Sequence, residues 1–222
     1  ENMGLRVISE HPFRLEVDNT PVYIQEFEVE SSSGEIDVDA RSAAFEDAFA
    51  RIWRGDAEND GFNRLVLGAS LEWRQVAMLR GYCKYLLQTG VPFSQNYVEE
   101  TLARYPLLAR LLVELFEARF DPATGQESKA QIKEGQVHFA QQLRSLAAGD
   151  EATLKALQYL IDARGESRQR QSEATHKTLL KLMDRVSSLD DDRILRSFIS
   201  VIEATLRTSY YQTRADGSPA HT

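Results

Sequence analysis

The chain has 222 residues, 42% of them hydrophobic, which is enough apolar material for the core of one large domain or two modest ones. Its formal net charge is −8 and its pI is near 5.1, so a nucleic-acid-binding or anionic membrane-binding surface is not expected, because both need a basic field. The only cysteine, Cys83, excludes an intrachain disulfide and a zinc site built from cysteines, so a cytoplasmic location is the default expectation. No apolar run reaches the ~18 to 20 residues of a membrane span.

The first 30 residues predict a β-hairpin. Apolar and polar residues alternate over residues 13–17, as a half-buried strand requires, and Asp-Asn-Thr-Pro at 18–21 is typical of a turn. In the second strand the apolar positions change phase between Ile24 and Phe27. One extra residue near Gln25 and Glu26 would restore a common apolar face, so we expect a β-bulge there.

A helix is predicted over residues 40–54, after a Ser-rich break at 31–34. Its apolar side chains recur at i, i+4, i+7 and i+8, which is the pattern of an amphipathic helix that we expect to pack on the hairpin. These apolar residues are Phe45, Phe49, Ile52 and Trp53. Two strands and one helix make a thin unit, so residues 1–60 should need further strands or a partner to complete the sheet, and an exposed sheet edge is predicted.

From Gly61 onward the hydrophobic period is helical throughout. Helices are predicted over residues 71–89, 95–104 and 107–120. The last of these is apolar on nearly all sides, which places it in the middle of a bundle. Asp-Pro-Ala-Thr-Gly at 121–125 is a candidate linker between a helical unit at 61–121 and a second one at 122–222.

The last hundred residues predict about four more helices, joined by short links. Their expected ranges are 127–148, 151–164, 171–187 and 190–211. Short links make sequential helices antiparallel neighbours, as in an up-down bundle. The predicted fold class is therefore mainly α, a multi-helix bundle preceded by a small, incomplete α+β unit made of a hairpin and a helix.

No catalytic or metal-binding constellation is visible in the sequence. The four histidines are far apart and none has a second ligand at i+3 or i+4, so a metal site is not expected. Cys83 lies on a buried helical face, which favours a core residue over a nucleophile. The glycines form no phosphate-cradling motif, which predicts no cofactor-binding residues in this chain. The aspartates at 190–192 are explained by a helix start, where Ser188 with Asp191 matches a capping box.

One surface is left as a candidate interface, at the end of the chain. Arginines on the polar face of the 190–211 helix lie beside tyrosines, and both residue types are enriched at protein interfaces. Because a polar helix face is usually only solvated, the simpler interpretation stays open. The candidate interface residues are Arg193, Arg196, Arg207, Tyr210 and Tyr211.

Several stretches resemble the large NAD-dependent glutamate dehydrogenases of bacteria. They are Gly-Leu-Arg-Val-Ile-Ser-Glu-His-Pro-Phe at 4–13, Phe-Asn-Arg-Leu-Val-Leu at 62–67 leading into Leu-Glu-Trp-Arg at 71–74, Asp-Arg-Ile-Leu-Arg at 192–196 and Ala-Thr-Leu-Arg-Thr at 204–208. The stretches occur in the order that the family has. Residues 122–187 carry no such motif and are interpreted from periodicity alone.

The resemblance implies a context for the chain. In that family ACT-like and helical modules precede the catalytic domain, so the hairpin and the 40–54 helix would be the later part of an ACT-like unit. The chain has no initiator methionine, and we expect it to be an excised piece of the non-catalytic amino-terminal region. The parent reaction would be oxidative deamination of L-glutamate, with NAD bound outside this segment.

The resemblance also implies partners. They would be the chain's own catalytic domain and neighbouring subunits of a homo-oligomer, with a small-molecule effector as a further possibility, and neither nucleic acid nor membrane. The alternative hypothesis is a free-standing helical adaptor whose arginine face binds an acidic protein partner.

Overall fold

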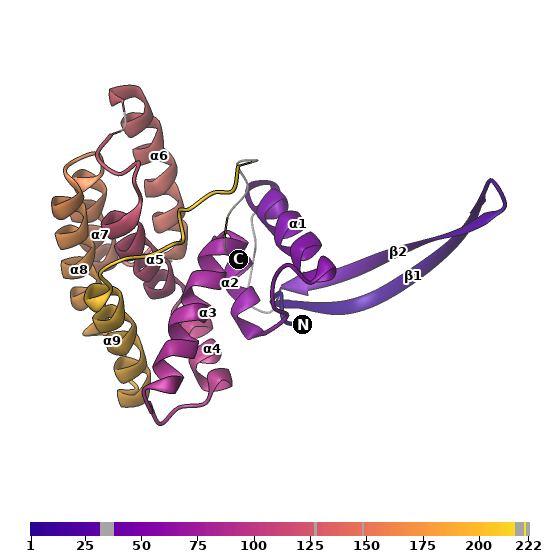
Figure 1. Ribbon diagram of the computed structural model, residues 1–222, viewed down its shortest axis with the longest axis horizontal. Coiled ribbons are helices and arrows are strands. Elements are labelled where there is room, and N and C mark those ends of the chain that lie inside the picture. The colour runs from indigo at the N-terminus through magenta and orange to yellow at the C-terminus, as the bar shows by residue number, and fades with distance from the viewer. Residues whose placement is uncertain (32–37, 127, 148, 216–219, 221–222) are drawn as a thin grey trace.

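The computed structural model describes residues 1–31, 38–126, 128–147, 149–215 and 220. Most of the predicted Ser-rich break, His221 and much of the polar tail therefore lie outside the described residues. The described part of the chain is mostly helical and begins with an antiparallel β-hairpin, which confirms the predicted fold class. Figure 1 shows the hairpin projecting from one side of the helical body. Within the described residues, no helix is both long and apolar enough to span a bilayer.

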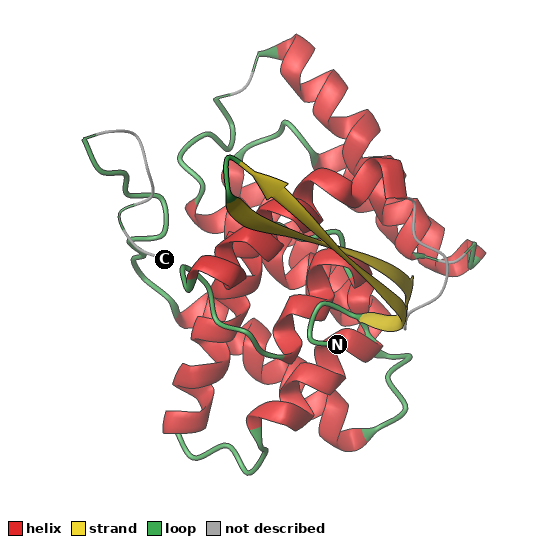
Figure 2. Ribbon diagram, turned by 90° about the vertical axis from the view of Figure 1, so that its right-hand side faces the viewer, coloured by secondary structure: helices red, strands yellow, loops and turns green. Residues whose placement is uncertain are grey.

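The hairpin consists of β1 (Leu5–Val17) and β2 (Thr20–Ser31). Asp18 and Asn19 form the two-residue turn with φ of 49° and 62°, the left-handed conformation that Asp and Asn tolerate and that matches the twist of hairpin strands. In Figure 2 the two strands cross over each other in front of the helices, as a strongly twisted two-stranded ribbon does.

The β-bulge is in the first strand and not in the second. Its extra residue is Ile8, because the pairing partner in β2 advances by only one position between Val7 and Ser9. Pairing continues without interruption through Gln25 and Glu26, so the prediction of a bulge there was wrong. The apolar side chains of β2 do change faces, because no core covers either face and nothing selects a single apolar side.

The large apolar side chains of the hairpin are exposed on both faces. Leu15 is 48% exposed and Phe27 is 47% exposed, although each is paired with a residue of the other strand. Among the described residues these two strands form the whole sheet, so each keeps an unpaired edge, as predicted. The exposed apolar residues of the hairpin are Val7, Ile8, Phe13, Leu15, Val17, Val22, Tyr23, Ile24, Phe27 and Val29.

Helix α1 (Val38–Arg54) confirms the predicted helix but not its packing. It contacts α2 (Arg64–Gly68) and α3 (Trp73–Gln88), and it buries Ala48 completely. The aromatic stripe predicted to cover the hairpin is largely open to solvent, with Phe49 51% and Trp53 82% exposed. The prediction of packing on the hairpin was wrong, because the small Ala48 face lets α1 lie closer to the helical body.

The rest of the body is built around one central helix. The remaining elements are η1 (Gly61–Asn63), α4 (Gln95–Arg104), α5 (Pro106–Phe120), α6 (Lys129–Leu146), α7 (Glu151–Ala163), α8 (Arg168–Met183) and α9 (Leu189–Ala204). Helix α5 contacts α2, α4, α6, α8 and α9. Its Leu111, Leu112 and Leu115 are fully buried, which confirms the central position predicted from its all-round apolar sequence.

The predicted linker at 121–125 is a turn in which Gly125 has a φ of 82°, a conformation that favours glycine. The turn is tied down, because the guanidinium of Arg168 donates to the backbone carbonyls of Arg119 and Asp121 at 2.9 and 2.7 Å. Helices before and after the turn share one hydrophobic core. The division into units at 61–121 and 122–222 stays a prediction.

Helix α9 ends earlier than predicted. Ser188 caps its start by accepting a hydrogen bond from the backbone N–H of Asp191, but the last helical residue is Ala204 and not residue 211. No glycine or proline marks this end. Thr205 becomes extended, and its hydroxyl lies 3.0 Å from the Tyr82 hydroxyl of α3, while Arg119 of α5 donates to the carbonyl of Glu203 at 2.8 Å. Tertiary contacts therefore end the helix.

Candidate functional site around the end of helix α9

Two of the candidate interface arginines pair within α9. Arg196 Nε donates to Asp192 Oδ2 at 2.8 Å, and Arg193 Nη1 lies 3.8 Å from Asp190 Oδ1. The hydrogen bond that Arg196 donates to Asp192 raises the pKa of Arg196 above its ordinary value. Both arginines are exposed, and surface pairs of this kind contribute ~0 to 1 kcal/mol. These two arginines thus have local partners, although the sequence left them without one.

Asp191 is a buried tertiary anchor as well as a residue of the helix start. Only 1% of it is exposed, and its carboxylate accepts hydrogen bonds from the Tyr97 and Thr101 hydroxyls, both at 3.1 Å, and from Arg104 at 2.5 Å. Burial alone would raise the pKa of Asp191, but the hydrogen bonds from Arg104, Tyr97 and Thr101 hold it below its usual range. Capping alone was therefore an incomplete explanation of this aspartate.

Tyr210 and Tyr211 turn inward. Their rings lie 5.2 and 6.2 Å from the Phe116 ring of α5, measured between centroids. Burial raises the pKa of both tyrosines above the ordinary value, and the Tyr211 hydroxyl is buried without a hydrogen-bond partner among the described residues. These rings do not share an open surface with Arg193 and Arg196, so the structure separates the five candidate residues. An interface role for them stays a prediction.

The segment from Thr205 to Tyr211, called the strap below, is held against α3. The guanidinium of Arg74 donates to the Tyr210 carbonyl and lies 4.4 Å from the centroid of the Tyr210 ring. Thr205 is held by Tyr82 at the other end of the strap. Arg207 lies between these anchors, exposed and without a hydrogen bond or ion pair among the described residues.

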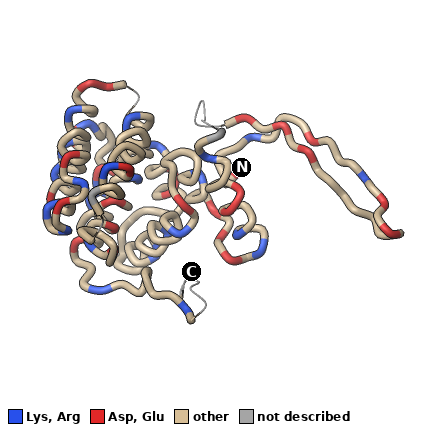
Figure 3. The backbone as a smooth tube through the Cα atoms, turned by 90° about the horizontal axis from the view of Figure 1, so that it is seen from above, with Lys and Arg blue, Asp and Glu red and all other residues tan. Residues whose placement is uncertain are grey.

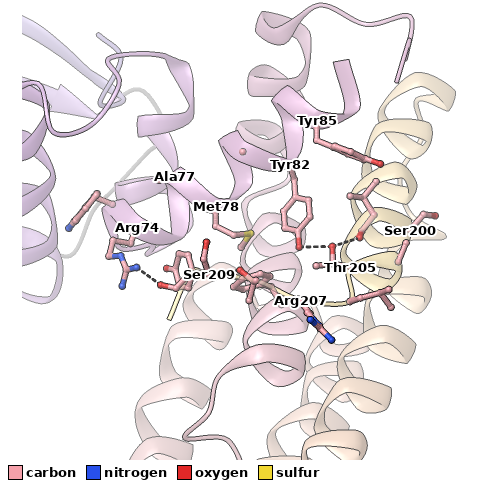
Figure 4. A pocket seen from close by; sticks show the side chains of 17 residues that line it. Arg74, Ala77, Met78, Tyr82, Tyr85, Ser200, Thr205, Arg207 and Ser209 are labelled. Carbon is pink, nitrogen blue, oxygen red and sulfur yellow. Dashed lines mark hydrogen bonds between the residues drawn. The ribbon is translucent and has the colours of Figure 1, made fainter. Parts of the chain in front are cut away.

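A groove of about 960 Å³ lies between α3, the end of α9 and the strap (Figure 4). We call it the α3–α9 groove. Its walls are mostly apolar and aromatic, and its charged lining residues are both arginines, Arg74 and Arg207. The main apolar and aromatic lining residues are Trp73, Met78, Tyr82, Tyr85, Phe116 and Leu206.

Sequence reasoning missed this groove because it treated α3 only as a core helix. A signal was present: Ala77 and Gly81 put two small residues at i, i+4 between larger aromatic neighbours, which leaves a hollow on that face. The early end of α9 carried no such signal. Because the end of α9 could not be predicted, the position of the strap beside this hollow could not be predicted either.

A cluster of charged and polar side chains lies inside the helical body, between α5 and its neighbours. Glu114 is buried and pairs with Arg110 at 2.7 Å and with Arg164 at 3.2 Å. Glu117 accepts a hydrogen bond from Gln75 Nε2 at 2.7 Å. Burial and the nearby charge of Glu114 raise the pKa of Glu117 to about 7.

The remaining reactive side chains have structural surroundings. Cys83 is fully buried, and burial together with the charges of Glu99 and Asp60 raises the pKa of its thiol to about 11, so it stays protonated near neutrality. This agrees with the core role predicted for it. In the described part of the chain, no group of three histidine, cysteine, aspartate or glutamate residues could hold a metal ion.

Three family models match separate parts of the chain. Residues 1–41 match "Glutamate dehydrogenase, ACT3 domain", residues 57–122 match "Glutamate dehydrogenase, helical motif 3", and residues 178–222 match "Bacterial NAD-glutamate dehydrogenase, catalytic domain". The α3–α9 groove thus has one wall in the helical motif and the other in the part that matches the catalytic-domain model.

Whole-chain similarity agrees with these matches. The NAD-specific glutamate dehydrogenase of Halomonas elongata is 38% identical over 218 residues, and that of Pseudomonas aeruginosa is 37% identical over 219, each alignment covering 98% of this chain. The enzyme of Mycobacterium tuberculosis is 34% identical over 221 residues, covering 96% of this chain. The chain spans 11% of the length of each of these relatives. It is a segment of the large bacterial NAD-specific glutamate dehydrogenase family, covering the end of the ACT3 domain, helical motif 3 and part of the catalytic-domain region.

Proposed function

We propose that this chain is a non-catalytic assembly and regulatory segment of an NAD-specific glutamate dehydrogenase. The parent enzyme would convert L-glutamate, NAD and water to 2-oxoglutarate, ammonia and NADH. The segment would hold the catalytic domain in a homo-oligomer, and its partners would be that domain and neighbouring subunits.

The exposed hairpin is the observation that carries the proposal. A two-stranded hairpin is marginally stable alone, and this one leaves apolar side chains open on both faces and both strand edges unpaired among the described residues. The exposed aromatic stripe of α1, in which the rings of Phe45, Phe49 and Trp53 follow one another at 6.2 and 6.1 Å, adds to this apolar surface. Such a surface fits burial against other protein.

The charge of the hairpin narrows the kind of partner. Acidic side chains outnumber basic ones along it, as Figure 3 shows by the red segments of the projecting strands. The acidic side chains are Glu10, Glu16, Asp18, Glu26, Glu28 and Glu30, and the basic ones are Arg6 and Arg14. This charge disfavours nucleic acid and anionic lipid, and it leaves a protein surface as the preferred partner.

We also propose that NAD binds outside this segment. Dinucleotides bind where a parallel sheet meets helix starts through a glycine-rich turn. The described sheet is an antiparallel hairpin, and the chain contains no G-x-G-x-x-G motif. The antiparallel hairpin and the lack of this motif support a dinucleotide site elsewhere in the parent enzyme.

The adaptor hypothesis is not favoured by any specific observation. It required an arginine face free to bind an acidic partner, but Arg193 and Arg196 pair with aspartates of their own helix. Similarity to glutamate dehydrogenases along nearly the whole chain favours the segment hypothesis instead.

Two measurements test the proposal. The purified chain should produce no NADH from glutamate and NAD, and turnover that follows the protein through purification would refute a non-catalytic role. In the full-length enzyme that contains this segment, the double variant Phe13→Ser with Ile24→Ser should lower the oligomer mass seen by sedimentation velocity. These two residues pair across the strands and are both about half exposed.

The control for the hairpin variant is Val137→Ser, which removes an even more exposed apolar side chain from α6, outside the hairpin. It should leave the oligomer unchanged. An oligomer that survives the double hairpin variant, with unchanged kinetics, would contradict the assembly role.

A further inference from the structure

We infer that the α3–α9 groove binds a small anionic molecule with an aromatic or other apolar body. This goes beyond the proposed function, because binding to the chain alone tests it, whether or not the chain regulates an enzyme. The open groove has room for such a molecule, since ligand pockets commonly have volumes of ~300 to 1,000 Å³ and this groove has a volume of about 960 Å³.

The charged residues that line the groove favour a negatively charged ligand. The whole chain holds 34 acidic residues against 26 basic ones, yet the groove is lined by two arginines and by no aspartate or glutamate. Arg74 is occupied by the Tyr210 carbonyl and ring. Arg207 is exposed at the rim with no described partner, so its guanidinium is available to pair with a carboxylate or sulfonate.

The shape of the groove and its apolar walls favour a ligand with an aromatic or other apolar body. Tyr82 and Tyr85 of α3 point toward the end of α9 across the groove (Figure 4). Tyr85 is 53% exposed, and Leu206, which also lines the groove, is 90% exposed. Gly81 lies on the same wall, and a Cβ added there would have no atom within 4 Å. An apolar body can therefore enter beside the aromatic rings, with its anionic group toward Arg207.

The walls of the groove come from two parts of the chain, so the site lies at the junction between them. Trp73, Tyr82 and Phe116 belong to the part that matches helical motif 3. The end of α9 and the strap belong to the part that matches the catalytic-domain model. A bound molecule would contact both parts at once, and ligand pockets often lie at such junctions.

The test uses 8-anilinonaphthalene-1-sulfonate as the anionic aromatic probe and N-phenyl-1-naphthylamine as its neutral counterpart. The sequence has two tryptophans, so a Trp53→Phe background leaves Trp73, in the groove wall, as the sole donor of energy transfer to the probe. We expect saturable transfer from Trp73 to the sulfonate. Arg207→Gln should weaken binding of the sulfonate about three- to tenfold and leave the neutral probe nearly unaffected.

Gly81→Leu is the blocking variant, because it fills the open wall while adding a better helix former than glycine. It should abolish the transfer from Trp73. Gly135→Leu is its matched control: this glycine is also helical, also has open space around its Cβ position, and lies in α6 outside the groove. It should bind the probe as the parent does.

The variants also separate this site from the exposed hairpin, which will bind such dyes nonspecifically. Transfer that is equal in the Gly81→Leu and Gly135→Leu chains would overturn the inference. It would also be overturned if Gly81→Leu converted a self-associated chain to a monomer without affecting the probe, because the groove would then be a contact between copies.

Discussion

The hairpin and the helical body follow opposite rules although they lie in one chain. In the body, apolar side chains are covered on all sides of α5, and the buried charges Arg80 and Asp191 each have close polar partners, such as Asp60 at 2.6 Å from Arg80. In the hairpin, ten large apolar side chains are exposed on two faces. The body thus buries a large apolar core and pairs these buried charges, whereas the hairpin leaves its apolar side chains exposed. This contrast is the reason why the proposal places the contact with other protein on the hairpin.

The largest expected effect is a core truncation in the body. Leu112→Ala should lower the free energy of unfolding by about 2 to 5 kcal/mol, because this leucine is fully buried and its removal leaves a cavity. Leu15→Ala in the hairpin should change it by less than about 0.5 kcal/mol. Urea unfolding followed by circular dichroism measures both. Equal losses of stability would mean that the hairpin folds cooperatively with the body. That result would contradict the difference between the two regions.

Asp191→Asn should destabilise the body by about 1 to 3 kcal/mol, because the hydrogen bonds that reach this carboxylate are optimised for a charge. The pKa of Asp191 is lowered in the folded chain, so its contribution is present above the unfolded pKa of about 4 and is lost as the pH falls below it. The stability difference between parent and variant should therefore shrink between pH 5 and pH 3. Asp190→Asn, at an exposed position of the same turn, is the control and should show a much smaller change.

Glu117 gives the opposite pH dependence. Its pKa is raised to about 7, so the folded chain holds this proton more tightly than the unfolded chain, and stability falls as the pH rises through 7. Glu117→Gln should remove that fall and gain on the order of 1 to 3 kcal/mol at pH 8, with little change at pH 5. Thermal melts at the two pH values check this. A stability difference that is the same at both would show that Glu117 titrates normally.

The smallest effect is expected at the surface arginines. Arg196→Ala and Arg207→Ala should each change the free energy of unfolding by less than about 0.5 kcal/mol, because one makes an exposed local pair and the other has no described partner. If they also leave the oligomer and kinetics of the full-length enzyme intact, this face is an ordinary solvated surface. A loss of assembly in either variant would extend the partner surface beyond the hairpin.

Local patterns in the sequence were sufficient to predict most elements. The turn at Asp18–Asn19, the central place of α5 and the start of α9 at Ser188 all follow from turn residues, all-round apolarity and a capping residue. What could not be predicted depends on contacts between distant residues. The end of α9 is set by Tyr82 and Arg119, which lie in other helices.

The same reason explains the errors in the hairpin and the site. The change of apolar phase in β2 suggests a bulge only if a core selects one face, and the structure has none there. The inward turn of Tyr210 depends on Arg74, which lies 136 positions earlier in the chain. Composition and periodicity carry no information on such a pair.

The anchoring of α9 at both ends has a mechanical consequence. Asp191 locks its first turn to α4, and the contacts of Glu203 and Thr205 lock its last turn to α5 and α3. A helix turns about 100° for each residue, so α9 cannot slide or roll without breaking one of these attachments. Helix α9 is therefore expected to move as a rigid body. A displacement of the strap would therefore tilt α9 as a whole. This tilt would be transmitted to α4 at the other end of the helix, about 16 residues away.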